Sequence, residues 1–143
     1  MMSSPTIGSR NRTGAEAGFT LLELLVVIAI LGLLIGLVAP AVLRQLGNAR
    51  NSVAKQSIAR IGGILDLYKL DVGGYPTTEE GLTALVKAPD RATNWNGPYL
   101  KGDVPNDPWG HPYTYRSPSS RSERDYDLCS NGANNSASTQ ICN

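Results

Sequence analysis

Histidine and cysteine, which are common in nucleophilic and metal-binding sites, are scarce in this 143-residue chain. The chain has one histidine, His111, and two cysteines, Cys129 and Cys142. His111 stands among turn residues, with no cysteine, serine or paired carboxylate at a spacing that catalysis uses, and a lone loop histidine is usually just exposed. The sequence therefore predicts no enzyme and no cofactor.

One carboxylate lies in an unusual place. Glu23 is the only ionisable side chain in the apolar run from Phe19 to Leu43. A helix of this length would extend roughly 37 Å, which is enough to cross a bilayer. Arg10 and Arg12 precede the run, so the positive-inside rule keeps residues 1–18 in the cytoplasm and places the remainder of the chain outside it.

An ordinary secretory signal is the alternative interpretation of this N-terminus. Ala39-Pro40-Ala41 would then be the cleavage site, because signal peptidase cuts after small residues. The apolar run is longer than the roughly 7 to 15 residues of a signal core, which favours a helix that the mature protein retains.

Beyond the apolar run the helical pattern becomes amphipathic. A stripe of apolar residues at spacings of three and four predicts that one helix continues from about Thr20 to Leu70. The stripe consists of Ala54, Ile58, Ile61, Leu65, Tyr68 and Val72. The segment Asp71–Pro76, with two glycines and a proline, ends it. Gly62 and Gly63 fit this helix poorly, because glycine costs about 1 kcal/mol in a helix interior.

The remaining residues predict a small head. Residues 77–89 look like a short helix capped by Thr77 or Thr78, and residues 112–116 and 125–129 alternate like two strands. Three prolines and three aromatics before and within the first strand predict a stiff, partly buried loop; they are Pro105, Pro108, Pro112, Trp109, Tyr113 and Tyr115. The fold class is thus α+β, a long N-terminal helix packed on a small antiparallel sheet. A net charge of +1, with no basic stripe, argues against nucleic acid as a partner.

The segment Gly18-Phe19-Thr20-Leu21-Leu22-Glu23 resembles the processing site of type IV pilins and pseudopilins. The resemblance implies that prepilin peptidase cuts between Gly18 and Phe19 and that the new amino group of Phe19 is methylated. Glu23 would then pair with the Phe19 amine of a neighbouring subunit, which would offset the cost of a charge in hydrocarbon. The alternative is that Glu23 only snorkels to the cytoplasmic interface.

Three helix-breaking or small residues follow at four-residue intervals, namely Gly32, Gly36 and Pro40. The glycine pair allows close helix approach, and the proline removes a backbone donor. Pilins carry a proline at this place, so the resemblance implies a helix that loosens there.

The blocks "GGYPTTEEGLTALVKAP" and "GPYLKGDVPNDPWGHPYTYRSP" narrow the resemblance to the major pseudopilin of the type II secretion system. The resemblance implies a structural subunit of the inner membrane: residues 1–18 a leader, residues 19–43 the membrane-spanning half of the helix, and residues 44–143 a periplasmic head. The subunit would form a homopolymer, the pseudopilus. Its implied partners are minor pseudopilins, an inner-membrane assembly platform and prepilin peptidase. A type IV pilin that forms surface fibres, or a signal-anchored enzyme or binding protein, is the alternative.

The C-terminus departs from the resemblance, which implies an aspartate-bearing calcium loop after the last strand. Residues 130–143 contain no aspartate or glutamate, and Asn134 stands where an aspartate is expected. Calcium prefers several oxygens, some of them charged, so the loop argues against a metal. Cys129 and Cys142 bracket it outside the cytoplasm and predict a disulfide.

Overall fold

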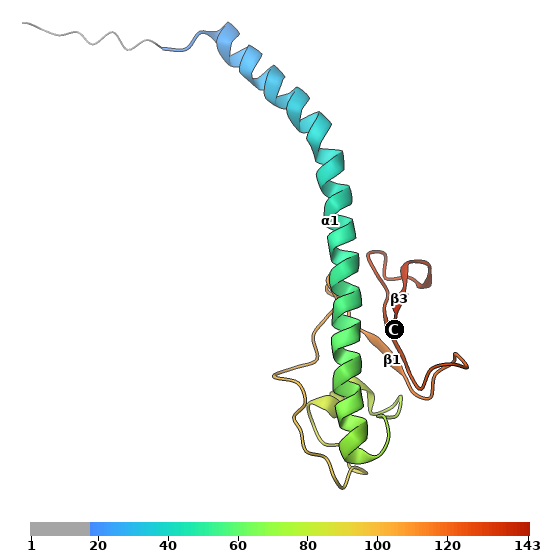
Figure 1. Cartoon of the computed structure of the whole chain (residues 1–143). Coiled ribbons are helices and arrows are strands. Elements are labelled where there is room, and N and C mark those ends of the chain that lie inside the picture. The colour runs from blue at the N-terminus through green and yellow to red at the C-terminus, as the bar shows by residue number, and fades with distance from the viewer. Residues whose placement is uncertain (1–17) are drawn as a thin grey trace, which may run out of the picture. The chain divides into compact units, whose positions relative to one another are not determined.

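The computed structural model describes residues 18–143. One long helix, α1 (Leu21–Val72), is followed by a short 3₁₀ helix, η1 (Gly81–Leu85), and by strand β1 (Thr114–Arg116) (Figure 1). Strand β2 (Asp127–Ser130), a second 3₁₀ helix, η2 (Ala137–Thr139), and strand β3 (Ile141–Cys142) complete the chain. The chain forms two compact units that divide after Ala41, and we call the second, Val42–Asn143, the head.

The predicted helix is confirmed to within two residues at each end. Thr20 begins it, because its side-chain oxygen accepts a hydrogen bond of 3.1 Å from the backbone N–H of Glu23. Gly73 ends it with a φ of 91°, a left-handed conformation that glycine adopts without strain. The Gly73 N–H closes the last turn on the carbonyl of Lys69 at 2.8 Å.

The apolar stripe of α1 forms the core of the head. Five of its six predicted members are buried, and Val72 is half-buried at the helix end. Leu82 and Leu85 of η1 and Leu128 of β2 are buried in the same cluster. Gly62 belongs to this face for a steric reason, since a Cβ there would lie 2.9 Å from the hydroxyl of Tyr126. Gly62 weakens the isolated helix, but its lack of a side chain leaves room for Tyr126 in the core.

The predicted helix over residues 77–89 is wrong in type and length. Only Gly81–Leu85 is helical, and it is a 3₁₀ helix. Gly81 has a φ of 58°, which breaks a right-handed helix before it can extend. The predicted cap at Thr77 forms, but it closes a turn and does not start an α-helix. The Glu80 carboxylate accepts a hydrogen bond from the Thr77 N–H at 2.8 Å, and the Glu80 N–H donates to the Thr77 hydroxyl at 3.3 Å.

The sheet is antiparallel, as predicted, but it has three strands in the order β1-β2-β3. Both predicted strands exist and begin two residues later than expected. The first cannot begin at Pro112, which has no N–H to donate to a ladder. Strand β3 was missed because two residues carry no alternating pattern, and it forms only through pairing of Cys142 opposite Cys129 and of Ile141 opposite Ser130.

Candidate functional site

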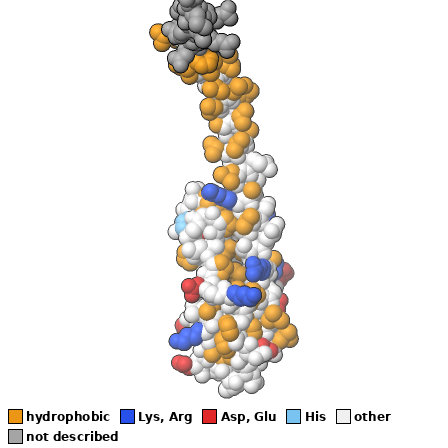
Figure 2. Space-filling view, turned by 90° about the vertical axis from the view of Figure 1, so that its left-hand side faces the viewer, with side chains coloured by type: hydrophobic (Ala, Val, Ile, Leu, Met, Phe, Trp, Pro, Cys, Tyr) orange, Lys and Arg blue, Asp and Glu red, His pale blue; other side chains and the backbone are white. Residues whose placement is uncertain are grey.

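The residues of the predicted processing site lie at the exposed start of α1. Phe19 is 86% exposed, and Gly18 and Glu23 are exposed as well. The apolar side chains after them are also exposed, and α1 is the one helix among residues 18–143 that is long and apolar enough to cross a membrane. Figure 2 shows apolar side chains over the visible face of this segment. Residues 1–17 of the predicted leader, with Arg10 and Arg12, lie outside the described residues.

Glu23 has no partner within residues 18–143. Its backbone N–H is used by the Thr20 cap, and no described side chain forms a hydrogen bond or ion pair with its carboxylate. Any partner of this carboxylate therefore lies outside the described residues. Pairing with a neighbouring Phe19 amine stays a prediction.

Gly32 and Gly36 leave open space beside the helix, since a Cβ at either position would meet no atom within 4 Å. Pro40 lies inside α1, which is assigned as helix without interruption from Leu21 to Val72. The surface at the two glycines is therefore free for close approach by another helix. The loosening expected near Pro40 stays a prediction.

In the head, a buried carboxylate that sequence reasoning missed joins two loops. The Asp107 side chain is fully buried and accepts hydrogen bonds from the Ser130 hydroxyl at 2.6 Å and from the backbone N–H groups of His111 and Trp109 at 2.8 and 3.0 Å. Ser130 also accepts from the Gly132 N–H at 3.2 Å. Asp107 thus ties the aromatic loop before β1 to the start of the C-terminal loop.

A lone loop histidine was expected to be exposed, but His111 is partly buried. Its side chain is 30% exposed, and its Nδ1 is buried without a hydrogen-bond partner, 3.9 Å from a carboxylate oxygen of Asp107. Burial alone would raise the pKa of Asp107, but the hydrogen bonds from Ser130, His111 and Trp109 outweigh it and hold that pKa below its ordinary value. The arrangement is structural, because both oxygens of the buried carboxylate accept hydrogen bonds from within the chain.

Replacing Asp107 by asparagine is expected to lower the free energy of unfolding at pH 7 by about 1–3 kcal/mol, because an amide cannot accept all three hydrogen bonds. The pKa of Asp107 is lower in the folded chain than in the unfolded chain. Its contribution is therefore complete above about pH 5 and is lost as the pH falls through about 4 toward the folded pKa. Urea unfolding between pH 3 and 7 should show a smaller loss of stability in acid for Asp107→Asn than for the wild type. Asp103→Asn, at an exposed neighbouring carboxylate, should unfold like the wild type; equal acid sensitivity of both variants would contradict the assignment.

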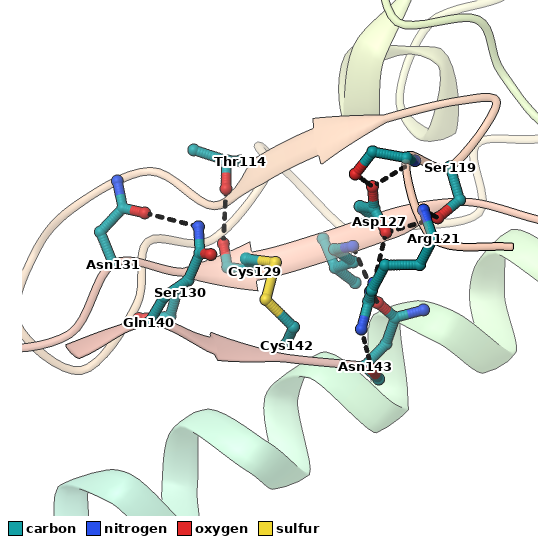
Figure 3. Close-up of a disulfide and its surroundings, with 12 residues drawn as sticks. Thr114, Ser119, Arg121, Asp127, Cys129, Ser130, Asn131, Gln140, Cys142 and Asn143 are labelled. Carbon is teal, nitrogen blue, oxygen red and sulfur yellow. Dashed lines mark hydrogen bonds and ion pairs between the residues drawn. A yellow bond between two sulfur atoms is a disulfide. The ribbon is translucent and has the colours of Figure 1, made fainter. Parts of the chain in front are cut away.

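The predicted disulfide between Cys129 and Cys142 is present and joins β2 to β3 (Figure 3). The loop that it closes is also held by its own hydrogen bonds. The Thr139 hydroxyl donates to the Asn131 carbonyl at 2.7 Å, and the Gln140 amide donates to the Asn131 side chain at 3.2 Å. A Cβ at Gly132 would collide with the Thr139 carbonyl oxygen, so glycine is what lets the loop close this tightly.

The oxygen atoms that this loop could offer as ligands do not fit a calcium ion. Residues 130–143 have no carboxylate side chain, and Asn134, the expected ligand position, is exposed. The Asn131 carbonyl already accepts from Thr139 and from the N–H of Ser136. In residues 18–143, no group of three or more His, Cys, Asp or Glu side chains could hold a metal ion.

A clasp missed by the sequence analysis holds the last residue of the chain. Arg121 donates to Asp127 at 2.7 Å and to the Asn143 side chain at 2.7 Å, and the Asn143 side chain also accepts from the Leu128 N–H at 3.0 Å (Figure 3). Hydrogen bonds from Ser119, above all, and from Ser120 and Arg121 hold the pKa of Asp127 far below its ordinary value. The clasp and the disulfide together fasten β3 to the sheet.

Comparison with known families matches two models to this chain. The prokaryotic N-terminal methylation motif matches residues 14–39, and type II secretion system protein G matches residues 41–142. The chain belongs to the type II secretion system protein G family. The predicted resemblance is thereby confirmed.

Relatives in this protein G family are similar over most of their length. The type II secretion system core protein G of Pseudomonas aeruginosa is 47% identical over 122 residues, which cover 82% of this chain and 84% of the relative. That of Escherichia coli (strain K12) is 39% identical over 131 residues, 90% of this chain and 89% of the relative. The crystal structure of the major pseudopilin from the type 2 secretion system of enterohaemorrhagic E. coli matches with a TM-score of 0.63 and 30% identity, over 71% of this chain and 91% of that one.

Proposed function

We propose that this protein is a major pseudopilin, a structural subunit that polymerises into the periplasmic pseudopilus and drives type II protein secretion across the outer membrane. One observation carries the proposal: a chain of the protein G family presents an exposed apolar helix immediately after the Gly18-Phe19 motif and ahead of a small α+β head. Neither a surface-fibre pilin nor a signal-anchored enzyme is favoured by these matches. The family is one of structural subunits, and we propose no catalytic role and no cofactor.

The exposed apolar segment has two successive environments in this proposal. Before assembly, residues 19–43 span the inner membrane, and residues 44–143, nearly all of the head, lie in the periplasm. During assembly the same side chains leave lipid and pack against the helices of other copies, so that apolar surface stays out of water throughout. Prepilin peptidase, minor pseudopilins and the inner-membrane assembly platform are the partners of this cycle.

Glu23 sets the register of the polymer. It lies four residues after Phe19, which corresponds to about 6 Å of rise if the mature chain is helical from its first residue, so two copies offset along the axis by about that distance bring an amine opposite a carboxylate. A pair inside a bundle of helices is worth more than in water, because the alternative is an unpaired charge in an apolar environment.

The mature chain is expected to begin at N-methylated Phe19. The Gly18-Phe19 bond is exposed and precedes the first turn of α1, so a peptidase can reach it without unwinding the helix. Intact-mass measurement and N-terminal peptide mapping of the protein purified from membranes test this expectation. A mature N-terminus near Val42 would mean ordinary signal cleavage, would remove the apolar segment and would contradict the proposed function.

The function itself is tested by complementation. A strain that lacks its protein G gene and expresses this chain should regain secretion of its type II substrates, and overexpression should yield filaments that contain the chain. Long surface fibres with no recovery of secretion would instead identify a type IV pilin.

A further inference from the structure

The charges of α1 are distributed unevenly. The 22 residues that follow the apolar run, 44–65, contain four basic residues and no acidic one. These are Arg44, Arg50, Lys55 and Arg60. All four are exposed, and none forms an ion pair with a described side chain. From residue 72 onward the head has eight acidic and six basic residues, so the excess of positive charge is confined to the stretch of helix next to the apolar run.

If the apolar run spans the membrane, Arg44 lies at the depth of the lipid head groups and Arg50 lies beyond them. A hydrocarbon core of about 30 Å is crossed by about 20 helical residues, which from Leu21 reaches Pro40. Arg44 and Arg50 follow at about 6 and 15 Å of further helix. Side chains on a helix tilt toward its N-terminus, here back toward the bilayer, which brings both guanidinium groups within reach of the phosphates.

The residues between and beside these arginines are suited to the same environment. Gln45, Asn48 and Asn51 are exposed amides, which can donate to phosphate and ester oxygens. Arg44 and Arg50 on a translocated side also run against the positive-inside rule, which favours cations in the cytoplasm. Their presence directly after the span therefore calls for a stabilising partner on that side.

We propose that the segment Arg44–Ser52 binds the phosphates of anionic phospholipids in the periplasmic leaflet and fixes the depth of the unassembled subunit in the membrane. A guanidinium matches a phosphate with two parallel hydrogen bonds, and the side chains of both arginines extend toward the layer of lipid phosphates. Lys55 and Arg60 stand farther along the helix and add attraction that salt screens. Extraction of the subunit into the filament then breaks these contacts. The proposal rests on the proposed membrane location of residues 19–43.

Lipid selectivity of the mature chain provides the test. The chain is reconstituted in phosphatidylcholine vesicles with a trace of spin-labelled phosphatidylglycerol or spin-labelled phosphatidylcholine, and electron paramagnetic resonance gives the fraction of each lipid held at the protein. We expect phosphatidylglycerol to be preferred by about fivefold at low salt and the preference to disappear near 1 M NaCl. Arg44→Gln with Arg50→Gln should reduce the preference at least by half. The control variant, Lys87→Gln with Lys101→Gln, removes two positive charges from exposed lysines of the head. It should leave the lipid preference unchanged.

Each contrary outcome has a separate meaning. A chain that is released from vesicles by alkaline extraction does not span them, which overturns the membrane location and this inference with it. A chain that stays in the vesicles but shows no preference, or the same preference in the double arginine variant, overturns the lipid inference alone. If that variant keeps its lipid preference and loses filament assembly, the arginines bind acidic groups of a second copy instead. Circular dichroism of both double variants confirms that α1 and the head are intact.

Discussion

Replacing Glu23 by glutamine is expected to reduce assembled pseudopili at least about tenfold while leaving Gly18-Phe19 cleavage and membrane insertion intact. The substitution keeps the size of the side chain and the Thr20 cap, which uses only the backbone N–H of residue 23. It removes the charge that would face a Phe19 amine, and an unpaired charge in an apolar environment costs about 2.5–3.5 kcal/mol. Quantification of sheared filaments, together with secretion of a type II substrate, measures the effect.

Glu79→Gln is the matched control, because Glu79 is an exposed carboxylate in the head with no described ion pair. It should assemble like the wild type. Normal filament yield and normal secretion with Glu23→Gln would show that the carboxylate only snorkels to the interface. Loss of cleavage in that variant would assign Glu23 to processing rather than to assembly.

Removing the disulfide is expected to have the largest effect on the stability of the head. A loop of about 14 residues contributes about 3 kcal/mol in the chain-entropy model, which corresponds to roughly 12–24 °C of melting temperature for a domain of about 100 residues. Cys129→Ser with Cys142→Ser, or reductant on the wild type, should show this loss. Chelator should change the melting temperature little, because the loop has no carboxylate for calcium and its Thr139 and Asn131 groups bond to each other.

Thiol titration accompanies these melts and should find no free thiol in the purified protein. Reductant applied to the double serine variant is the control, and it should not shift the melting curve further. Free thiols together with a large loss of stability in chelator would contradict the proposal. That result would mean that amide and backbone oxygens of residues 130–141 hold a metal without help from carboxylates.

The long helix, its buried face and the disulfide were predictable because each depends on one local pattern. Apolar side chains at spacings of three and four fix which side of residues 54–72 is buried, whatever packs against it. Only two cysteines are present, so their pairing needed no choice among alternatives. The processing motif at Gly18 was equally local, although its use by a peptidase is still a prediction.

The short elements of the head were not predictable in the same way. Residues 77–89 have the composition of a helix, but Gly81 adopts a positive φ and only a 3₁₀ turn remains. Nothing in Ile141–Cys142 marks a strand, because two residues cannot show a period. The role of Asp107 was not predictable, since its partner Ser130 lies 23 residues away in the sequence.

By itself, the sequence determined the membrane-length apolar helix, the motif at its start, the amphipathic continuation and the pairing of the two cysteines. These features are periodic or unique, so they need no knowledge of what lies nearby in space. Only the tertiary structure decided why Gly62 belongs in the helix, how Asp107 links two loops, and how Arg121 and Asn143 fasten the last strand. Each of these depends on atoms brought within about 3 Å from distant parts of the chain, and sequence spacing carries no record of that approach.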